Sequence, residues 1–382
     1  LDNYPSFKAM TVAPDGNSSR LLTEAGASYQ FPAWSPDNRQ IAAVGNDGSE
    51  GGVYVWADEA NATRDELYSS RRRLPIYLYW SPDGSQVSFL ANDRNGLGLW
   101  LAGIGGETPA RQIASGQPFY WQWSQDSDQL FVHSDGIGPG ARLGWLEPGE
   151  NELADNVARP GLFQAPGISA DGRYLAFGQR DGERFQVAVE ERASGRRATA
   201  PHNGLAALSW SPAAPHLAWT SPRNDQFSTA GPLRLLDADS GDIFVLIRDT
   251  VLAFFWSPDG QSIAYLTLAS GGNDAGAGRP AGLAALAPSQ PAQHSALSLR
   301  LWVVNVASGQ QRQIYTFRPS EIFLTQFLPF FDQYALSHRL WSPASDALVL
   351  PMLDSGGEAG IYVVPVNGGE AVRVADGGMA FW

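Results

Sequence analysis

Histidine is the side chain that most readily performs acid–base chemistry or binds a transition metal near neutral pH. The five histidines of this 382-residue chain are His133, His202, His216, His294 and His338, and no two of them have a spacing typical of metal ligands. None lies close in sequence to a serine and an aspartate that would complete a nucleophilic triad. We expect His133, His216 and His338 to be structural residues on strands, and His202 and His294 to lie in loops. The histidines therefore indicate neither a catalytic residue nor a metal site.

Paired carboxylates are a second possible source of chemistry, because they can hydrolyse glycosides or bind calcium. The pattern Asp237-x-Asp239-x-Gly241 matches only part of a calcium loop, since the third ligand, the glycine at the sixth position and the distant glutamate are missing. A hairpin turn explains it better. A pair such as Glu147 and Glu150 is expected by chance in so acidic a chain. There is no cysteine, which excludes disulfides, thiolate zinc sites and cysteine nucleophiles.

The overall composition narrows the class of protein. The chain carries 39 acidic and 26 basic side chains, for a formal net charge of −13. Nucleic acid is therefore not an expected partner, because binding phosphates needs a basic surface. Hydrophobic residues make up 43% of the chain, and the rest includes 41 glycines and 26 prolines. This composition favours a folded protein built from short elements and excludes coiled coils and helical solenoids.

The sequence contains no expected transmembrane segment. Its longest apolar runs, such as 251–256 and 361–366, have the length of a β-strand, whereas a membrane-spanning helix needs about 20 apolar residues. The chain begins at Leu1 without the basic and apolar regions of a signal peptide. We expect that any targeting peptide was removed or precedes this sequence.

A short motif recurs along the chain. Seven copies begin with an apolar residue followed by serine, at Trp34, Trp80, Trp123, Ile168, Trp210, Trp256 and Trp341. Most continue with proline or aspartate, several reach a glycine, and an aliphatic residue always stands seven positions after the first. Proline and aspartate favour the corners of a type I turn, and glycine favours the left-handed position after it. The motif therefore predicts a tight turn between two strands.

The spacing of the copies indicates the size of each unit. The copies are 42 to 46 residues apart up to Trp256, Trp341 follows after 85 residues, and Trp382 comes 41 residues later. A period in the low forties fits four short strands, as in a propeller blade. Strand-like segments fall at the expected places, at 41–44, 53–56, 87–91, 99–102, 185–189, 233–236, 299–306 and 361–366.

Stacked four-stranded sheets are the expected architecture, with tryptophan filling the space between neighbouring sheets. These structural tryptophans are Trp34, Trp80, Trp123, Trp210, Trp256, Trp341 and Trp382. Eight third-and-fourth strand pairs are counted, beginning at 7–22, against seven complete first-strand hairpins. Residues 378–382 supply an eighth first strand, which would join the N-terminal blade and close the ring. We predict an all-β propeller with a single domain over 1–382, with eight blades favoured and seven as the alternative.

The segment from Trp256 to Tyr265, with the sequence WSPDGQSIAY, resembles the TolB-type, WD-like propeller repeat. The resemblance covers nearly the whole chain and implies a β-propeller outside the cytoplasm, in the periplasm or at the cell surface. It does not choose a function, because similar repeats occur in TolB and in the propellers of prolyl oligopeptidases, dipeptidyl peptidases and tricorn-type proteases. We expect neither the additional N-terminal domain of TolB nor a peptidase domain, since the chain has no Gly-x-Ser-x-Gly motif.

Two inserts account for the long gap between Trp256 and Trp341. They span 269–298, which is rich in alanine, glycine and proline, and 318–337. The up-and-down connections of a blade predict both inserts on one face of the disc, together with the blade-connecting arginines Arg71, Arg72 and Arg73. Long loops in compact domains often carry function.

The second insert and the arginines are the candidate partner-binding residues. The insert contains Phe323, Phe327, Phe330, Phe331 and Tyr334 within fourteen residues. It either folds as a lid onto its own blades or forms an apolar docking patch for a protein partner. The arginine triplet is either a solvated loop or an anchor for a carboxylate-rich partner.

Three functions remain open from the sequence. The lack of a catalytic constellation and the uneven loops favour a non-enzymatic scaffold that needs no cofactor and binds a protein partner through the insert-bearing face. The first alternative is an enzyme, or a binder of a small ligand or ion, working at the central channel where first strands converge. The second is a structural subunit of a larger, membrane-associated assembly.

Overall fold

The computed structural model describes residues 7–23, 27–46, 48–59, 62–94, 96–106, 108–149, 156–224, 228–269 and 297–382. Nearly all of its regular structure is antiparallel β-sheet, as the sequence predicts. The chain divides into two compact units. The first comprises Leu1–Pro160, Leu336–Arg339 and Ala380–Trp382, and the second comprises Gly161–Ala335 and Leu340–Met379.

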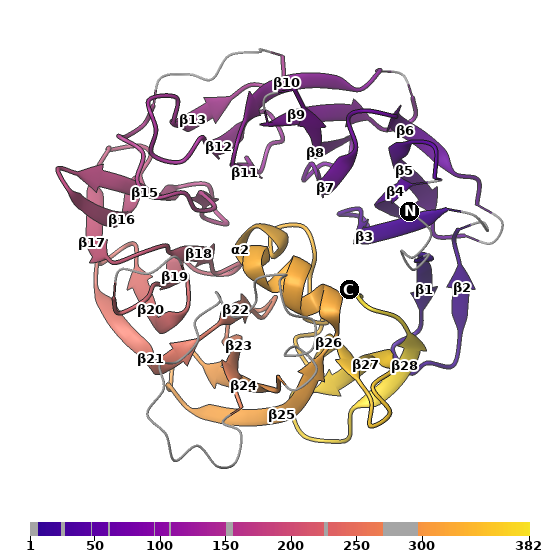
Figure 1. Ribbon diagram of the computed structural model, residues 1–382. Helices are drawn as coiled ribbons and strands as arrows, with labels where there is room; N and C mark the ends of the chain where they lie inside the picture. The colour runs from indigo at the N-terminus through magenta and orange to yellow at the C-terminus, as the bar shows by residue number, and fades with distance from the viewer. Residues whose placement is uncertain are drawn as a thin grey trace. The chain divides into compact units, whose positions relative to one another are not determined.

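The described residues of the first unit form four sheets, in which each strand pairs with its neighbour in sequence (Figure 1). A two-stranded ribbon contains β1 (Met10–Val12) and β2 (Ser19–Leu21). One four-stranded sheet contains β3 (Ser28–Trp34), β4 (Gln40–Asn46), β5 (Gly51–Ala57) and β6 (Asp65–Ser70). The other contains β7 (Pro75–Trp80), β8 (Gln86–Asp93), β9 (Gly96–Gly103) and β10 (Arg111–Gly116). A three-stranded sheet contains β11 (Phe119–Trp123), β12 (Leu130–Ser134) and β13 (Arg142–Leu146).

The described residues of the second unit form two four-stranded sheets and one of seven strands. The first sheet contains β14 (Gly167–Ile168), β15 (Tyr174–Asp181), β16 (Arg184–Glu191) and β17 (Arg197–His202). The second contains β18 (Ala207–Trp210), β19 (His216–Thr220), β20 (Gly231–Asp237) and β21 (Ile243–Val251). The third contains β22 (Ala253–Trp256), β23 (Ser262–Leu268), β24 (Leu299–Asn305), β25 (Gln311–Pro319), β26 (Ala347–Leu353), β27 (Ala359–Pro365) and β28 (Val372–Asp376). The strand segments expected from the sequence lie on these strands to within a residue.

The repeated serine motif forms a turn whose hydrogen bonds explain its residues. Ser81 Oγ donates a hydrogen bond to Asp83 Oδ1 at 2.6 Å and accepts one from the Gln86 N–H at 3.0 Å. Gly84 has a φ of 72°, in the left-handed region that glycine adopts without strain. The same serine–aspartate bond occurs at Ser35, Ser124, Ser169 and Ser257. Because one hydroxyl both donates and accepts inside the turn, serine is the residue that fits each of these copies.

The leading tryptophans connect adjacent sheets within each unit. Three indole N–H groups reach the carbonyl just before the leading residue of the preceding repeat: Trp80 donates to Ala33 O at 3.0 Å, Trp256 to Ser209 O at 3.1 Å and Trp341 to Phe255 O at 3.0 Å. Trp123 donates instead to Ser88 Oγ at 2.9 Å. A buried indole is favoured here because its ring fills the space between sheets while its N–H stays hydrogen-bonded.

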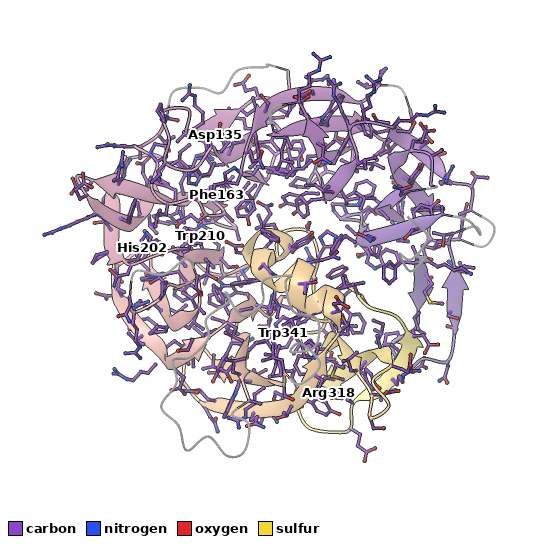
Figure 2. The ribbon with its side chains drawn as sticks, in the orientation of Figure 1. Asp135, Phe163, His202, Trp210, Arg318 and Trp341 are labelled. Atoms are coloured by element: carbon purple, nitrogen blue, oxygen red, sulfur yellow. The ribbon has the colours of Figure 1, made fainter. Side chains whose placement is uncertain are left out.

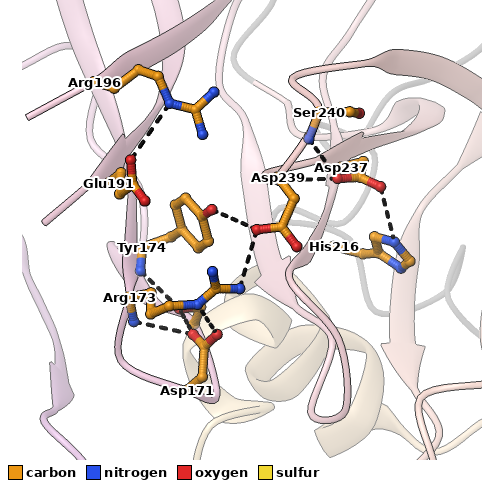
Figure 3. Close-up of polar contacts among 10 residues, drawn as sticks. Asp171, Arg173, Tyr174, Glu191, Arg196, His216, Asp237, Asp239 and Ser240 are labelled. Atoms are coloured by element: carbon orange, nitrogen blue, oxygen red, sulfur yellow. Dashed lines mark hydrogen bonds and ion pairs between the residues drawn. The ribbon is translucent and has the colours of Figure 1, made fainter. Parts of the chain in front are cut away.

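A polar cluster joins the β14–β17 sheet to the β18–β21 sheet (Figure 3). Arg173 Nε lies 2.6 Å from Asp171 Oδ2, and its NH2 lies 3.1 Å from Asp239 Oδ1, which also accepts a hydrogen bond from Tyr174 OH at 2.7 Å. Burial alone would raise the pKa of Asp171, but hydrogen bonds from Ser169 and Arg173 outweigh it and lower the pKa to about 2. The cluster therefore links a hairpin turn of one sheet to a hairpin turn of the next.

The predicted closing strand is not found. Residues 378–382 form no strand, and within the described residues β1 and β2 pair only with each other. The C-terminal tail packs elsewhere in the first unit, because the Trp382 N–H donates to Arg339 O at 2.9 Å and the Phe381 ring lies 4.5 Å from the His338 ring. The blade count and the closure are therefore not confirmed. The first insert, 269–298, lies almost wholly outside the described residues.

Candidate functional site

The predicted arginine triplet lies in a well-fixed turn between β6 and β7 of the first unit. Ser70 Oγ accepts hydrogen bonds from the backbone N–H groups of Arg72 at 3.2 Å and Arg73 at 3.1 Å. Tyr68 OH donates to Arg73 O at 2.8 Å. Burial raises the pKa of Tyr68, so its hydroxyl stays protonated and remains a donor. Side chains of β6 therefore fix the backbone of the turn.

The three arginine side chains have different surroundings. Arg73 Nε lies 3.5 Å from Asp93 Oδ1, and its guanidinium lies 5.6 Å from the centre of the Trp100 ring. Arg71 and Arg72 are exposed, and neither forms an ion pair with the residues that the structure describes. Arg71 and Arg72 are therefore two adjacent exposed cations, whereas Arg73 contacts Asp93 on β8 and Trp100 on β9.

The second insert interrupts the strand that pairs with β26 in the second unit. β25 pairs with β26 through Arg318↔Leu353 and Pro319↔Met352. A strand running straight on from Pro319 would set residue 323 opposite Leu348, but Leu348 pairs with Trp341, 18 positions later. Arg318 and Trp341 mark the two ends of the interruption (Figure 2). The segment between them leaves the sheet, forms helical turns and returns to the same strand position.

The helical turns of the insert bury most of its aromatic residues. A π-helix spans Phe323–Phe327, a 3-10 turn spans Leu328–Phe330, and α2 spans Phe331–Tyr334. Four of the five predicted docking residues are buried, namely Phe323, Phe327, Phe331 and Tyr334, and Phe330 alone of the five is 47% exposed.

Packing within the second unit accounts for this burial. The Phe331 ring lies 5.4 Å from the Phe254 ring and 5.7 Å from the Phe255 ring, and Phe327 stacks on Phe255 at 6.0 Å. The segment lies beside β18 and β22 in Figure 1. This geometry favours the interpretation of the insert as a lid on its own sheets, and it leaves only Phe330 of the aromatic set available to a partner.

Asp332 is a buried carboxyl group within the same insert. Its Oδ1 accepts a hydrogen bond from the Gln333 N–H at 3.0 Å, and the backbone of Ala165 also bonds to it. Burial raises the pKa of Asp332 to about 6, although these hydrogen bonds oppose the rise. The sequence does not single out this aspartate, because its burial depends on the insert folding back onto distant strands.

A chain of hydrogen bonds in the first unit was also missed by sequence reasoning. His338 Nε2 lies 3.1 Å from Phe31 O and Nδ1 lies 2.6 Å from Ser337 Oγ, which in turn lies 2.7 Å from Tyr77 OH. A carbonyl only accepts, so Nε2 carries the proton and Nδ1 accepts from Ser337 O–H. The Tyr77 O–H must then donate to Ser337 Oγ. The Ser337–His338 dipeptide was the one local signal, and its partners lie 260 and 307 positions away.

The network resembles a nucleophile with its base, but its energetics favour a structural role. Burial lowers the pKa of His338 to about 4, although the hydrogen bond to Phe31 opposes the shift. A base of that strength removes a proton from a serine hydroxyl poorly at neutral pH, where the most effective general bases have pKa values close to the ambient pH. The network therefore holds residues 337–338 against β3 and β7.

The remaining histidines and carboxylates form no metal centre in the described part of the chain. No group of three or more His, Asp or Glu residues there is placed to hold a metal ion. His216 lies 3.6 Å from Asp237, whose Oδ1 accepts hydrogen bonds from the N–H groups of Asp239 and Ser240 (Figure 3). This segment is the predicted hairpin turn. His202 ends β17 and His338 lies in no strand, so the expected loop position of the first and strand position of the second are wrong. His294 lies outside the described residues.

Solved structures match this chain although sequence comparisons do not. No model of a known protein family matches, and no curated protein matches. An oligogalacturonate lyase in complex with manganese is 13% identical over 97% of this chain and 86% of its own, with a TM-score of 0.53. The β-propeller domain of the Trilobed protease from Pyrococcus furiosus is 11% identical over 92% of this chain and 98% of its own, with a TM-score of 0.51. This chain has a β-propeller fold.

A TolB structure also matches, over part of both chains. TolB from Acinetobacter baumannii is 20% identical over 62% of this chain, with a TM-score of 0.41, and the match spans 58% of the TolB chain. At such identities, likeness shows the propeller fold alone, because one fold serves many unrelated functions. Among the described residues, no helix has both the length and the apolar character needed to cross a membrane.

Proposed function

We propose that this propeller is a non-enzymatic scaffold that binds a carboxylate-rich segment of a protein partner at Arg71 and Arg72. The observation that carries the proposal is the fixed turn with two exposed guanidinium groups. Two adjacent arginines can each bind a carboxylate through two parallel hydrogen bonds. Because Ser70 and Tyr68 already hold the backbone, binding orders little more than the two side chains.

Charge gives this turn selectivity. The chain as a whole has a net charge of −13, which repels an acidic segment at long range. Arg71 and Arg72 are a local exception, while Arg73 is already paired with Asp93. An acidic partner is therefore guided to this position, and its affinity should fall as salt screens the charges.

The proposal also includes the wider setting of the protein. We propose eight blades, with β1 and β2 as part of one of them, and a periplasmic or cell-surface location.

A structural role in a larger membrane-associated assembly is the second candidate function, and co-purification of a partner at a fixed stoichiometry would favour it. An experimental structure of the whole chain tests the blade count, and fractionation of cells tests the location.

A photo-cross-linking experiment tests the binding site. A photoreactive side chain replaces the exposed Ile76 next to the turn, and cross-linked partners from the native source are quantified by mass spectrometry. The double variant Arg71→Glu/Arg72→Glu should lose at least about tenfold of the cross-linked partner, because each reversal replaces an attraction by a repulsion. The matched control is Arg39→Glu, an exposed arginine in another turn of the same unit. Equal yields from the double variant and the wild type would overturn the proposal.

A further inference from the structure

The outermost strand of one sheet in the second unit begins with exposed apolar residues. β21 stands at the end of the order β18-β19-β20-β21 and, among the described residues, pairs on one side only. Ile243, Phe244 and Val245 are 43%, 46% and 41% exposed. Successive residues of a strand point to opposite faces, so apolar surface lies on both sides of this edge. An edge of this kind offers unpaired backbone groups beside apolar surface.

The corresponding strands of the other sheets are built differently. Each has a charged residue at its first or second position, which is a common protection of sheet edges against unwanted pairing. These residues are Asp65 on β6, Arg111 on β10, Arg197 on β17 and Arg373 on β28. Arg312 stands at the second position of β25, which is not an edge because its end also pairs with β26. On β21 the first charged residue is the sixth, Arg248. Compared with the equivalent strands of the other repeats, β21 lacks a charged residue at its start.

Three arginines lie along β21, one opposite its first half and two at its second half. Arg223 NH2 donates to Arg248 O at 2.6 Å, and Arg234 on β20 pairs with Val245. Burial and repulsion from Arg223 lower the pKa of Arg234, whose NH1 donates to the neutral acceptors Ser221 Oγ and Pro232 O, each at 3.3 Å. None of the three arginines forms an ion pair within the described residues. The cluster is therefore complementary to carboxylates.

We propose that the edge of β21 binds an extended, apolar segment of a partner protein that carries acidic residues at the end nearest Arg248. The segment adds a short strand beside Ile243–Val245, where the register against β20 is regular before it shifts. Its apolar side chains cover the exposed residues, and its carboxylates neutralise the three arginines. This surface belongs to the second unit and is separate from the arginine turn, so the two proposals stand or fall independently.

Charge complementarity favours this partner over a second copy of the chain. A second β21 would bring its own Arg223, Arg234 and Arg248 to the edge against two acidic residues, Asp249 on the strand and Asp242 just before it. Two chains of net charge −13 would also repel each other. A segment with two acidic residues and no arginine satisfies the cluster without either cost.

Two capped, fluorescent peptides test the proposal against the full chain by anisotropy. Their sequences are Glu-Glu-Thr-Val-Thr-Val-Thr-Val and the reverse order, because a strand can add in either direction. We expect one of them to bind saturably and to weaken about tenfold with Phe244→Lys, with Arg248→Gln, and when its glutamates become glutamines. Phe244→Thr, which keeps strand propensity without a charge, should weaken it to a smaller extent. The matched control Val372→Lys, on the exposed start of β28, and the double variant Arg71→Glu/Arg72→Glu should leave binding unchanged.

Several results would overturn the proposal. One is that neither peptide binds, and another is that Phe244→Lys and Val372→Lys weaken binding equally. A third is that the glutamine peptides bind as tightly as the glutamate peptides. Sedimentation velocity supplies the last, because a concentration-dependent dimer that Phe244→Lys dissociates would identify a second copy as the occupant of this edge.

Discussion

Replacing Asp332 by asparagine should stabilise the protein at neutral pH. The Asp332 carboxyl is 6% exposed, and burial raises its pKa from 3.8 to about 6. Above pH 6 the folded protein therefore holds a buried negative charge that the unfolded chain keeps in water. Asparagine has nearly the same shape as the protonated carboxyl and keeps an oxygen that accepts from the Gln333 N–H.

The size of the effect follows from the shift in pKa. A shift of about 2 units corresponds to roughly 3 kcal/mol, at 1.36 kcal/mol for each unit. The folded pKa is higher than the unfolded one, so the penalty is absent below pH 3.8, where both states are protonated, and complete above pH 6. The new amide NH₂ group needs hydrogen-bond acceptors in a buried environment, and this requirement reduces the gain in stability by about 1 kcal/mol. The expected gain is about 2 kcal/mol at pH 7.5, whereas at pH 4, where only about 0.5 kcal/mol of the penalty is present, the variant should be less stable than the wild type by about 0.5 kcal/mol.

Urea denaturation followed by tryptophan fluorescence measures this difference at both pH values. The exposed Glu321→Gln removes the same charge from the same insert and should change the free energy of unfolding by less than about 0.5 kcal/mol. Subtracting the wild type at each pH removes the contributions of all other titrating groups. The reasoning is refuted if Asp332→Asn is destabilising at pH 7.5, or if its effect is the same at the two pH values.

Two further predictions concern His338 and the repeated turn. Burial lowers the folded pKa of His338 from 6.5 to about 4, so the contribution of this histidine to stability is fully present above pH 6.5. It is lost as the pH falls to 4, which lowers the free energy of unfolding by roughly 3 kcal/mol. His338→Gln should reduce this loss of stability in denaturation curves measured between pH 6.5 and 4, and an unchanged dependence on pH would contradict the assignment. Ser81→Ala removes a buried hydroxyl that donates to Asp83 and accepts from Gln86, and should destabilise by about 1–3 kcal/mol. The exposed Ser85→Ala in the same turn is its control, and equal losses in thermal unfolding would show that the buried network has no special weight.

The repeated strands were predictable because their signals are local. The serine, the aspartate and the residue at positive φ make their hydrogen bonds within five or six positions, so each copy of the motif specifies its own turn. Alternating apolar residues then define the strands on both sides of it. At 378–382 a leading-type tryptophan was the only signal for a strand, and these residues form none.

The candidate sites were predicted only in part. Arg71, Arg72 and Arg73 look alike in the sequence and are all exposed, and only the tertiary structure pairs Arg73 with Asp93 and leaves the other two without an ion pair among the described residues. The apolar run of β21 reads like any strand, and its exposure depends on its place at the end of a sheet. Which apolar residues remain accessible is decided by neighbours far away in the chain.

The sequence by itself determined the all-β class, the repeat length and the turn chemistry, because these rest on interactions between residues a few positions apart. The tertiary structure alone decided that the aromatic insert is folded inward, that Asp332 and His338 are buried with opposite pKa shifts, and that Ser337 and His338 meet Tyr77 and Phe31. Burial and long-range contacts depend on how separate sheets stack, and no short stretch of sequence contains that information.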